Sequence, residues 1–254
     1  MKFTRAITRT PAPSLAQGIT SANLGLVNFQ NALQQHANYV QALERLGLTV
    51  TVLPADEAYP DSTFVEDVAL IFGDLAIVTN PGAASRNGET KGIRPALREH
   101  FEHLATIHPP GTLDGGDVMW TENRVYVGLS SRTNRAGAEQ LEKHLKNAGL
   151  ELIVVEMAEM LHLKTGVNYL DQKNLLVAGE FTEAPIWNEF NRIVVSPDEA
   201  YAANSVCING SVLVPAGFRQ TALAIEQLGY PVVTVDTSKF QKLDGGLSCL
   251  SLRF

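Results

Sequence analysis

The chain has 254 residues, of which 45% are hydrophobic and 19% charged, and its formal net charge at pH 7 is -7. This length and composition are those of a globular protein that buries a substantial core. The acidic balance and the lack of a Lys/Arg tract argue against binding to nucleic acid or to an anionic membrane, and they suit a cationic ligand.

The first residues do not resemble a targeting sequence. Residues 1–18 scatter basic residues among Thr and Pro without a continuous apolar segment, and no later segment predicts a membrane span. The two cysteines, Cys207 and Cys249, do not make a disulfide framework, and free thiols are typical of a reducing compartment. We therefore expect a cytoplasmic protein with a single domain over residues 1–254.

The first elements expected along the chain are a strand, a helix, a second strand and a hairpin. Residues 3–8 form the strand, and residues 29–46 place apolar side chains at the three- and four-residue spacing of an amphipathic helix. Gly47 then stands where a helix C-cap favours a left-handed residue. An extended strand follows at 48–53, and two apolar strands joined by a turn are predicted over 68–79.

The same elements recur further along the chain. Residues 118–129 predict a second hairpin, which is followed by a helix over 138–148 and a strand over 150–155. The last third repeats this order, with a hairpin at 205–214, a helix at 222–228 and a strand at 232–235. The repeated unit is therefore strand, strand, helix, strand.

Polar residues introduce each unit, in steps of about 42 to 48 residues, a period found in propeller blades. These markers are Glu66-Asp67, Asp114, His162, Asn204 and Cys249. The Leu-Asp-Gly-Gly sequence at 113–116 is repeated letter for letter at 243–246. If five units surround a pseudo-symmetry axis, equivalent positions at the start of each inner strand converge near it. The N-terminal strand must then complete the unit of Cys249, so the two chain ends should be neighbours.

The converging residues suit nucleophilic catalysis. A cysteine nucleophile needs an acid–base partner, and that partner needs an orienting group. Cys249, His162 and Asp114 can fill these three roles. Cys207 lies inside a predicted strand and is interpreted as a core residue. The other histidines do not stand at the position that His162 occupies in the repeated unit.

Carboxylates also gather at or near this position of the repeated unit. Glu66 and Asp67, with Asp61 just upstream, would be costly to cluster unless a cation lies between them. A guanidinium fits, because its planar N–H donors match carboxylates, and its charge beside Cys249 would favour the thiolate. The alternative is that these acids are turn and cap residues on a solvated rim, and it stays open for Asp61 above all.

Two arginines stand on connections that leave the hairpins. Either Arg86 or Arg132 could bind an α-carboxylate, although exposed arginines are also common in loops. The glycine-rich residues 114–117 have neither the spacing nor the lysine of a phosphate-binding loop, and no Cys/His spacing fits a zinc site. We therefore expect a small-molecule substrate and neither a cofactor nor a metal.

A set of motifs resembles the dimethylarginine dimethylaminohydrolase family of guanidino-group-modifying enzymes. They are Phe-Val-Glu-Asp at 64–67, the segment 82–89, Leu-Asp-Gly-Gly-Asp at 113–117, Ser-Arg-Thr-Asn at 131–134, Leu-His-Leu-Lys at 161–164, Tyr-Ala-Ala-Asn at 201–204 and Asp-Gly-Gly-Leu-Ser-Cys at 244–249. The resemblance covers essentially the whole chain. It implies an α/β protein with the five-bladed propeller, or pentein, fold, and it suggests a homodimer.

The resemblance also implies a role for each candidate residue. Cys249 is the nucleophile, His162 the general acid and then base, and Asp114, where some members carry Glu, orients His162. The remaining roles concern substrate binding: Glu66 and Asp67 hold the guanidinium with support from Asp61, Arg86 and Arg132 bind the amino-acid end, Ile19 belongs to a lid, and Leu243 offers a backbone contact.

The implied reaction is covalent hydrolysis of a methylated arginine to citrulline without a cofactor. The Cys249 thiolate adds to the guanidinium carbon, and His162 protonates the departing methylamine or dimethylamine. Water activated by His162 then hydrolyses the S-alkylthiouronium.

Related functions fit the same fold. Arginine deiminases carry His-x-Asp where this chain has His162 and Lys164, and a lysine cannot grip a guanidinium, so the pocket should accept N-methyl groups. Deiminase and, less closely, amidinotransferase are the rival enzymes. The fold also includes a ribosome-binding initiation factor without catalytic activity, so fold alone does not imply an enzyme. Cys249 and His162 stand at equivalent positions of the repeated unit, which favours an enzyme.

Overall fold

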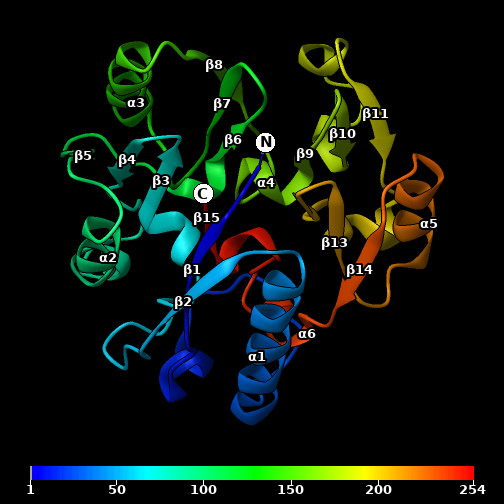
Figure 1. Ribbon diagram of the computed structural model, residues 1–254, viewed down its shortest axis with the longest axis horizontal. Coiled ribbons are helices and arrows are strands. Elements are labelled where there is room, and N and C mark those ends of the chain that lie inside the picture. The colour runs from blue at the N-terminus through cyan, green and yellow to red at the C-terminus, as the bar shows by residue number, and fades with distance from the viewer. Residues whose placement is uncertain (1) are drawn as a thin grey trace.

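A computed structural model describes residues 2–254, and in it five three-stranded sheets stand around one axis like propeller blades (Figure 1). Met1 lies outside the described residues. In every sheet the middle strand pairs antiparallel with the inner strand and parallel with the outer strand. This arrangement confirms the five-part α/β propeller.

The sheets are made of short strands. From inner to outer strand they are β15 (Leu252–Arg253), β1 (Arg5–Arg9) and β2 (Thr49–Leu53); β3 (Ala69–Phe72), β4 (Leu75–Val78) and β5 (Leu104–Thr106); β6 (Val118–Trp120), β7 (Arg124–Leu129) and β8 (Glu151–Glu156); β9 (Val167–Asp171), β10 (Asn174–Val177) and β11 (Asn191–Val194); and β12 (Val206–Ile208), β13 (Ser211–Pro215) and β14 (Val232–Val235). The three predicted hairpins are confirmed as β3–β4, β6–β7 and β12–β13.

Outer helices join the middle strand to the outer strand in most units. They are α1 (Phe29–Arg45), α2 (Glu89–Arg98), α3 (Arg135–Asn147) and α5 (Arg219–Gln227). The three predicted helices are confirmed as α1, α3 and α5. The glycines that follow them, Gly47, Gly149 and Gly229, have φ angles of 89°, 74° and 91°, which is the left-handed conformation expected at a helix end.

The unit of β9, β10 and β11 departs from the predicted strand, strand, helix, strand order. Two short 3-10 helices, η5 (Gly179–Phe181) and η6 (Pro185–Trp187), replace the outer helix. Gly179 has a φ of 55°, which lies outside the helical region, and Pro185 lacks the N–H that a continuing helix would donate, so both residues disfavour one long helix here. The Trp187 side chain, fully buried, fills the space between the sheets instead.

Two elements give weak signals in the sequence. The β9–β10 hairpin turns at Gln172 and Lys173, whose φ angles are 46° and 64°, although neither residue is a usual choice for this conformation. Helix α2 contains Pro95, which ordinarily marks a helix boundary. In the β9–β10 turn and in helix α2, tertiary packing therefore outweighs the conformational preference of these residues.

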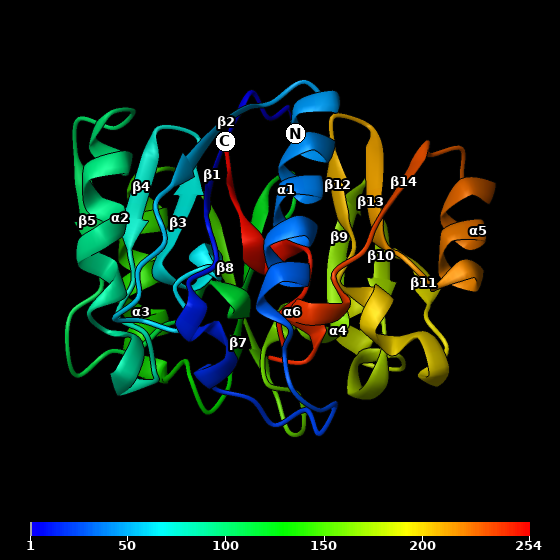
Figure 2. The same ribbon diagram turned by 90° about the horizontal axis from the view of Figure 1, so that it is seen from below.

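The two ends of the chain close the ring. The amides of Thr4 and Arg5 donate to the carbonyl oxygen of Phe254 at 2.9 and 2.7 Å, and the amide of Phe254 donates to Arg5 O at 3.0 Å. This confirms that the chain ends are neighbours. Both ends lie at one end of the molecule, while the short helices α4 (Leu163–Gly166) and α6 (Ser238–Gln241) lie toward the other (Figure 2).

Apolar side chains pack mainly between neighbouring sheets. One cluster joins Met119 of β6 to Val167 of β9 and Leu175 of β10, and each such side chain contributes about 1.5–3 kcal/mol when buried. No single sheet has a core of its own, so the turns near the axis are held by the whole ring. Among the described residues, no helix is both long and apolar enough to cross a membrane.

Candidate active site

Turns from all five units meet at one end of the central axis. Each precedes an inner strand: η2 (Val65–Val68), η4 (Gly115–Asp117), α4, η7 (Pro197–Ala203) and η8 (Ser248–Leu250). Glycines permit the close approach. A Cβ atom on Gly116 would lie 2.7 Å from Nδ1 of His162, and one on Gly246 would lie 2.5 Å from the side chain of Asn204. The ring thus gathers the polar residues whose spacing repeats in the sequence.

His162 is held by Asp114. Its Nε2 lies 3.2 Å from Oδ2 of Asp114, and the fully buried Asp114 also accepts a hydrogen bond on Oδ1 from the amide of Gly82 at 2.8 Å. Burial alone would lower the pKa of His162, but Asp67 and the hydrogen-bonded Asp114 raise it to about 9. The imidazole is therefore protonated at neutral pH and able to give up a proton.

The thiol of Cys249 lines the same pocket as His162. The residue is buried, and the amide of Gly246 donates to its Sγ at 3.3 Å. Burial, followed by the charges of Glu66 and Asp67, raises the pKa of the thiol to about 12. The free protein therefore holds a neutral thiol, and a cation bound between these carboxylates would lower the pKa toward thiolate formation.

Asp67 connects His162 to a buried arginine. Its Oδ1 accepts from the amide of Gly116 at 2.9 Å, and its Oδ2 accepts from Nη1 of Arg86 at 2.5 Å. Burial alone would raise the pKa of Asp67, but the positive charges of His162 and Arg86 hold it well below its ordinary value. Asp67 is therefore ionised and can attract a cationic substrate.

The guanidinium of Arg86 is committed to the protein framework. Beyond Asp67, it donates from Nε and Nη2 to Glu89 at 3.0 and 2.8 Å and from Nη2 to the carbonyl of Phe64 at 3.0 Å. Arg132 is half-buried, and its side chain makes no hydrogen bond or ion pair within the described part of the chain. Both arginines line the pocket, but the guanidinium of Arg132, unlike that of Arg86, is not paired with a carboxylate of the described residues.

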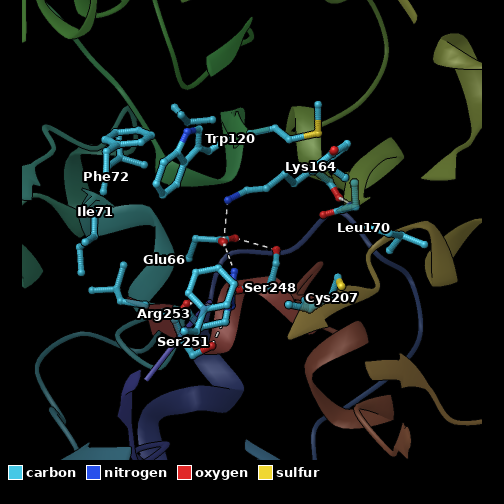
Figure 3. Close-up of a pocket in the computed structure, with 18 of the residues that line it drawn as sticks. Glu66, Ile71, Phe72, Trp120, Lys164, Leu170, Cys207, Ser248, Ser251 and Arg253 are labelled. Carbon is cyan, nitrogen blue, oxygen red and sulfur yellow. Dashed lines mark hydrogen bonds and ion pairs between the residues drawn. The ribbon is translucent and has the colours of Figure 1, made fainter. Parts of the chain in front are cut away.

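Glu66 separates the pocket from a second cavity around the propeller axis (Figure 3). Its Oε1 pairs with Nζ of Lys164 at 2.6 Å and with Arg253 at 3.3 Å, and its Oε2 accepts from the hydroxyl of Ser248 at 2.7 Å. Glu66 and Lys164 line both cavities. Two cations therefore balance the charge of Glu66 before any substrate binds.

The second cavity opens away from Cys249. Its wall includes Phe72, Trp120 and the half-buried Cys207, whose Sγ lies 3.9 Å from a carboxylate oxygen of Asp171. The interpretation of Cys207 as a core residue is therefore only partly correct, because one side of it faces this cavity.

The loop that carries Ile19 covers one side of the pocket. The amide of Ile19 donates to both carboxylate oxygens of Asp61, at 3.1 and 3.2 Å. The amide and hydroxyl of Ser21 donate to Oδ2 of Asp244 at 2.6 and 3.0 Å, next to the buried Leu243. Asp61 and Asp244 therefore anchor this loop, while the Ile19 side chain stays 40% exposed.

The pocket brings together the candidate residues from the sequence. One half is lined by Ile19, Asp61, Asp67, Arg86, Arg132, His162, Leu243 and Cys249, and the adjoining half by Glu66, Lys164, His162 and Cys249. Asp114 lies behind His162. Further lining residues are not singled out from the sequence. Phe64, Leu161, Tyr201, Asp244 and Gly245 belong to the motifs noted above, whereas Thr165 lies just outside them.

Ligand atoms of Asp67, Asp114 and His162 lie within 4.8 Å of one another, a spacing that a metal ion could use. These atoms are already paired, because Asp114 binds His162 and Asp67 binds Arg86. We therefore interpret the cluster as a hydrogen-bonded acid–base network.

Comparison with known protein families and sequences gives a consistent result. The chain matches the family described as N,N dimethylarginine dimethylhydrolase, eukaryotic, over residues 21–183. It is 46% identical to N(G),N(G)-dimethylarginine dimethylaminohydrolase of Pseudomonas aeruginosa, over 99% of this chain and 100% of that protein. The protein of the same name from Streptomyces coelicolor is 38% identical, over 100% of this chain and 98% of that protein.

Solved structures agree with the sequence matches. The Pseudomonas aeruginosa enzyme, as a C249S mutant complexed with citrulline, has a TM-score of 0.98 and 45% identity, with all of both chains covered. The N-terminal domain of ArgZ, a cyanobacterial arginine dihydrolase, is 18% identical with a TM-score of 0.87, over 98% of this chain and 97% of that one, and shows the fold alone. The chain belongs to the dimethylarginine dimethylaminohydrolase family.

Proposed function

We propose that the chain hydrolyses the guanidino group of ω-methylated arginine, giving citrulline and methylamine or dimethylamine. The observation that carries this proposal is the convergence of Cys249, His162 and Asp67 on one pocket. Support also comes from the relatives: the Pseudomonas aeruginosa protein is named for this activity and has been solved with citrulline.

The proposed reaction proceeds through a covalent intermediate. Asp67 attracts the guanidinium, whose charge lowers the pKa of Cys249, so that the thiol proton passes to solvent and the thiolate sulfur bonds to the guanidinium carbon. Protonated His162 gives its proton to the amine nitrogen, and the C–N bond breaks to leave an S-alkylthiouronium. Now neutral, His162 takes a proton from water as the oxygen adds to the same carbon. The C–S bond then breaks as the hydroxyl proton passes to solvent, releasing citrulline and the thiolate.

Lys164 gives a reason for a methylated substrate. It pairs with Glu66 at 2.6 Å, and Asp67 is already paired with Arg86, so these two carboxylates have few acceptor positions left for a guanidinium. A dimethylated guanidinium has lost the N–H donors of one nitrogen, so it needs fewer acceptors than arginine does. A pocket whose acceptors are largely engaged therefore suits it better.

Arg132 is the proposed partner of the substrate carboxylate. Replacing it by Gln should raise KM by about 10- to 100-fold, the loss expected for a charge-assisted pair, and change kcat little. Steady-state kinetics with asymmetric dimethylarginine test this. Arg135→Gln is the matched control, because Arg135 is an exposed neighbour paired with Glu156 at 2.8 Å and should leave KM unchanged. Equal KM values in both variants would contradict the assignment.

A substrate panel tests the proposed function itself. Purified protein should release citrulline from asymmetric dimethylarginine and monomethylarginine, with much slower release from arginine. Faster release from arginine would make the protein a deiminase. No release from any of the three compounds would favour a non-catalytic binding protein.

Three further features belong to the proposal. We place the protein in the cytoplasm because Cys207 and Cys249 are free cysteines, which suit a reducing compartment. We also propose a single catalytic domain, which the closed ring supports, and a homodimer, which the family resemblance supports.

A further inference from the structure

Asp117 is a fully buried carboxylate that does not line the pocket. It ends η4, and hydrogen-bond donors surround it. Its Oδ1 accepts from the amide of Leu163 at 3.0 Å, and its Oδ2 accepts from the hydroxyls of Ser130 at 2.7 Å and Thr133 at 2.6 Å. Burial raises the pKa of Asp117, and the charge of His162 and these hydrogen bonds act against that rise.

The bond to Leu163 fixes the backbone beside the acid–base group. Leu163 begins α4, and His162 is the residue immediately before it. The carboxylate of Asp117 therefore holds the start of the short helix that follows His162, whose side chain lines the same pocket as Cys249.

The two hydroxyls connect Asp117 to other parts of the site. The Oγ of Ser130 accepts from the amides of Arg132 at 2.9 Å and Thr133 at 3.2 Å. The Oγ1 of Thr133 accepts from the amide of Asp114 at 3.1 Å. The carboxylate of Asp117 is thus linked to the backbone of Arg132 through the Ser130 hydroxyl. It is linked to the backbone of Asp114 through the Thr133 hydroxyl.

We propose that Asp117 is a positioning residue for the hydrolysis, which holds His162, Asp114 and Arg132 in one fixed arrangement. The inference rests on the proposed function, because that function assigns the acid–base role to His162 and the substrate carboxylate to Arg132. A misplacement of about 1 Å at such a site can cost about 10²-fold in rate. Asp117 thus joins the two ends of the proposed substrate site.

An amide cannot replace this carboxylate. In Asp117→Asn one oxygen stays an acceptor and the other becomes an NH₂ donor. The Leu163 amide can only donate, and the Ser130 hydroxyl already accepts two N–H groups. Either the loop of His162 or the loop of Arg132 therefore loses its tether.

The variant Asp117→Asn should reduce kcat and raise KM for asymmetric dimethylarginine, each by about tenfold or more. It should also lower the pKa of His162, because a nearby negative charge is removed. The alkaline limit of kcat/KM should then move to lower pH. The groups that face His162 from the surrounding elements are Asp67 of η2, Asp114 and Asp117 around η4, Cys249 of η8 and Lys164 of its own helix.

Glu199→Gln is the matched control. Glu199 is also buried and also accepts bonds from amides and a hydroxyl, from Gln220 N at 3.0 Å and from Thr221 N and Oγ1 at 2.6 Å each. It caps α5 and does not line the pocket. This variant should lower Tm while kcat, KM and the pH profile stay as in the unmodified protein.

A second variant covers the case in which Asp117→Asn does not fold. Ser130→Ala keeps the carboxylate charge and removes the links to the amides of Arg132 and Thr133, so KM should rise several-fold with the pKa of His162 unchanged. NMR titration of the His162 ring measures that pKa without turnover. An unmodified protein that releases no citrulline would reject the proposed function, while a lowered His162 pKa in Asp117→Asn would still be measurable. Unchanged kcat, KM and pKa in Asp117→Asn, or unchanged KM in Ser130→Ala, would overturn the inference.

Discussion

Replacing Cys249 by Ser should abolish citrulline release, with a loss of about 10⁴-fold or more in kcat. The serine hydroxyl fits the same buried space, but its proton is far harder to remove than that of a thiol. The guanidinium that lowers the thiol pKa cannot lower the hydroxyl pKa far enough. Quantifying citrulline over several hours, with mass spectrometry of the protein to look for the covalent adduct, measures the effect.

Cys207→Ser is the control for this substitution. Cys207 is half-buried on the wall of the second cavity and has no part in the proposed reaction. The variant should turn over asymmetric dimethylarginine as the unmodified protein does. Turnover retained in Cys249→Ser would exclude Cys249 as the nucleophile, and turnover lost in Cys207→Ser would contradict the statement that Cys207 has no part in the reaction.

Replacing His162 by Asn should reduce kcat by about 10²- to 10⁴-fold, the usual contribution of a general acid–base group. The loss should depend on the leaving group. An S-methylthiocitrulline substrate expels a thiolate, which needs no proton, so a single release of methanethiol should persist. The adduct should then accumulate, because its hydrolysis requires the imidazole as a base. Rapid-quench kinetics with both substrates separate the two steps.

The pH profile gives a second measure of the same residue. Since Asp67 and Asp114 raise the pKa of His162 to about 9, the proton-donating form persists at neutral pH and is lost as pH rises through that value. Activity of the unmodified protein should therefore fall above about pH 9. His103→Asn, at a fully solvated histidine, should keep the complete profile. A profile without an alkaline decline would contradict the role of His162.

Much of the fold is visible in the sequence because its signals are local. Gly47, Gly149 and Gly229 mark helix ends by their conformational freedom, and pairs of short apolar segments around a turn mark the hairpins. The constant spacing of Asp114, His162 and Cys249 then reveals the ring. The connection that contains Gly179 and Pro185 is not predicted from such signals. Its conformation depends on how Trp187 packs between two sheets rather than on a repeated local pattern.

The sequence indicates which residues belong to the candidate site, but it does not indicate which of them pair with one another. Arg86 and Arg132 give the same signal, yet Arg86 turns inward to Asp67 and Glu89 while Arg132 stays unpaired in the described chain. Asp61, for which a rim or cap role stays open in the sequence, binds the backbone of the Ile19 loop. These differences depend on how far each side chain reaches in three dimensions, which spacing alone does not encode.

Closure of the ring has a consequence for the order of events during folding. Each turn of the site comes from a different unit, and the bond between Glu66 and Arg253 joins residues 187 positions apart in the chain. Loops of this length are slow to close, since their entropy must be lost before the contact forms. Secondary structure can thus be recovered early in refolding while catalysis waits for the last unit to join the first. Return of activity would therefore report the final, longest-range step of assembly.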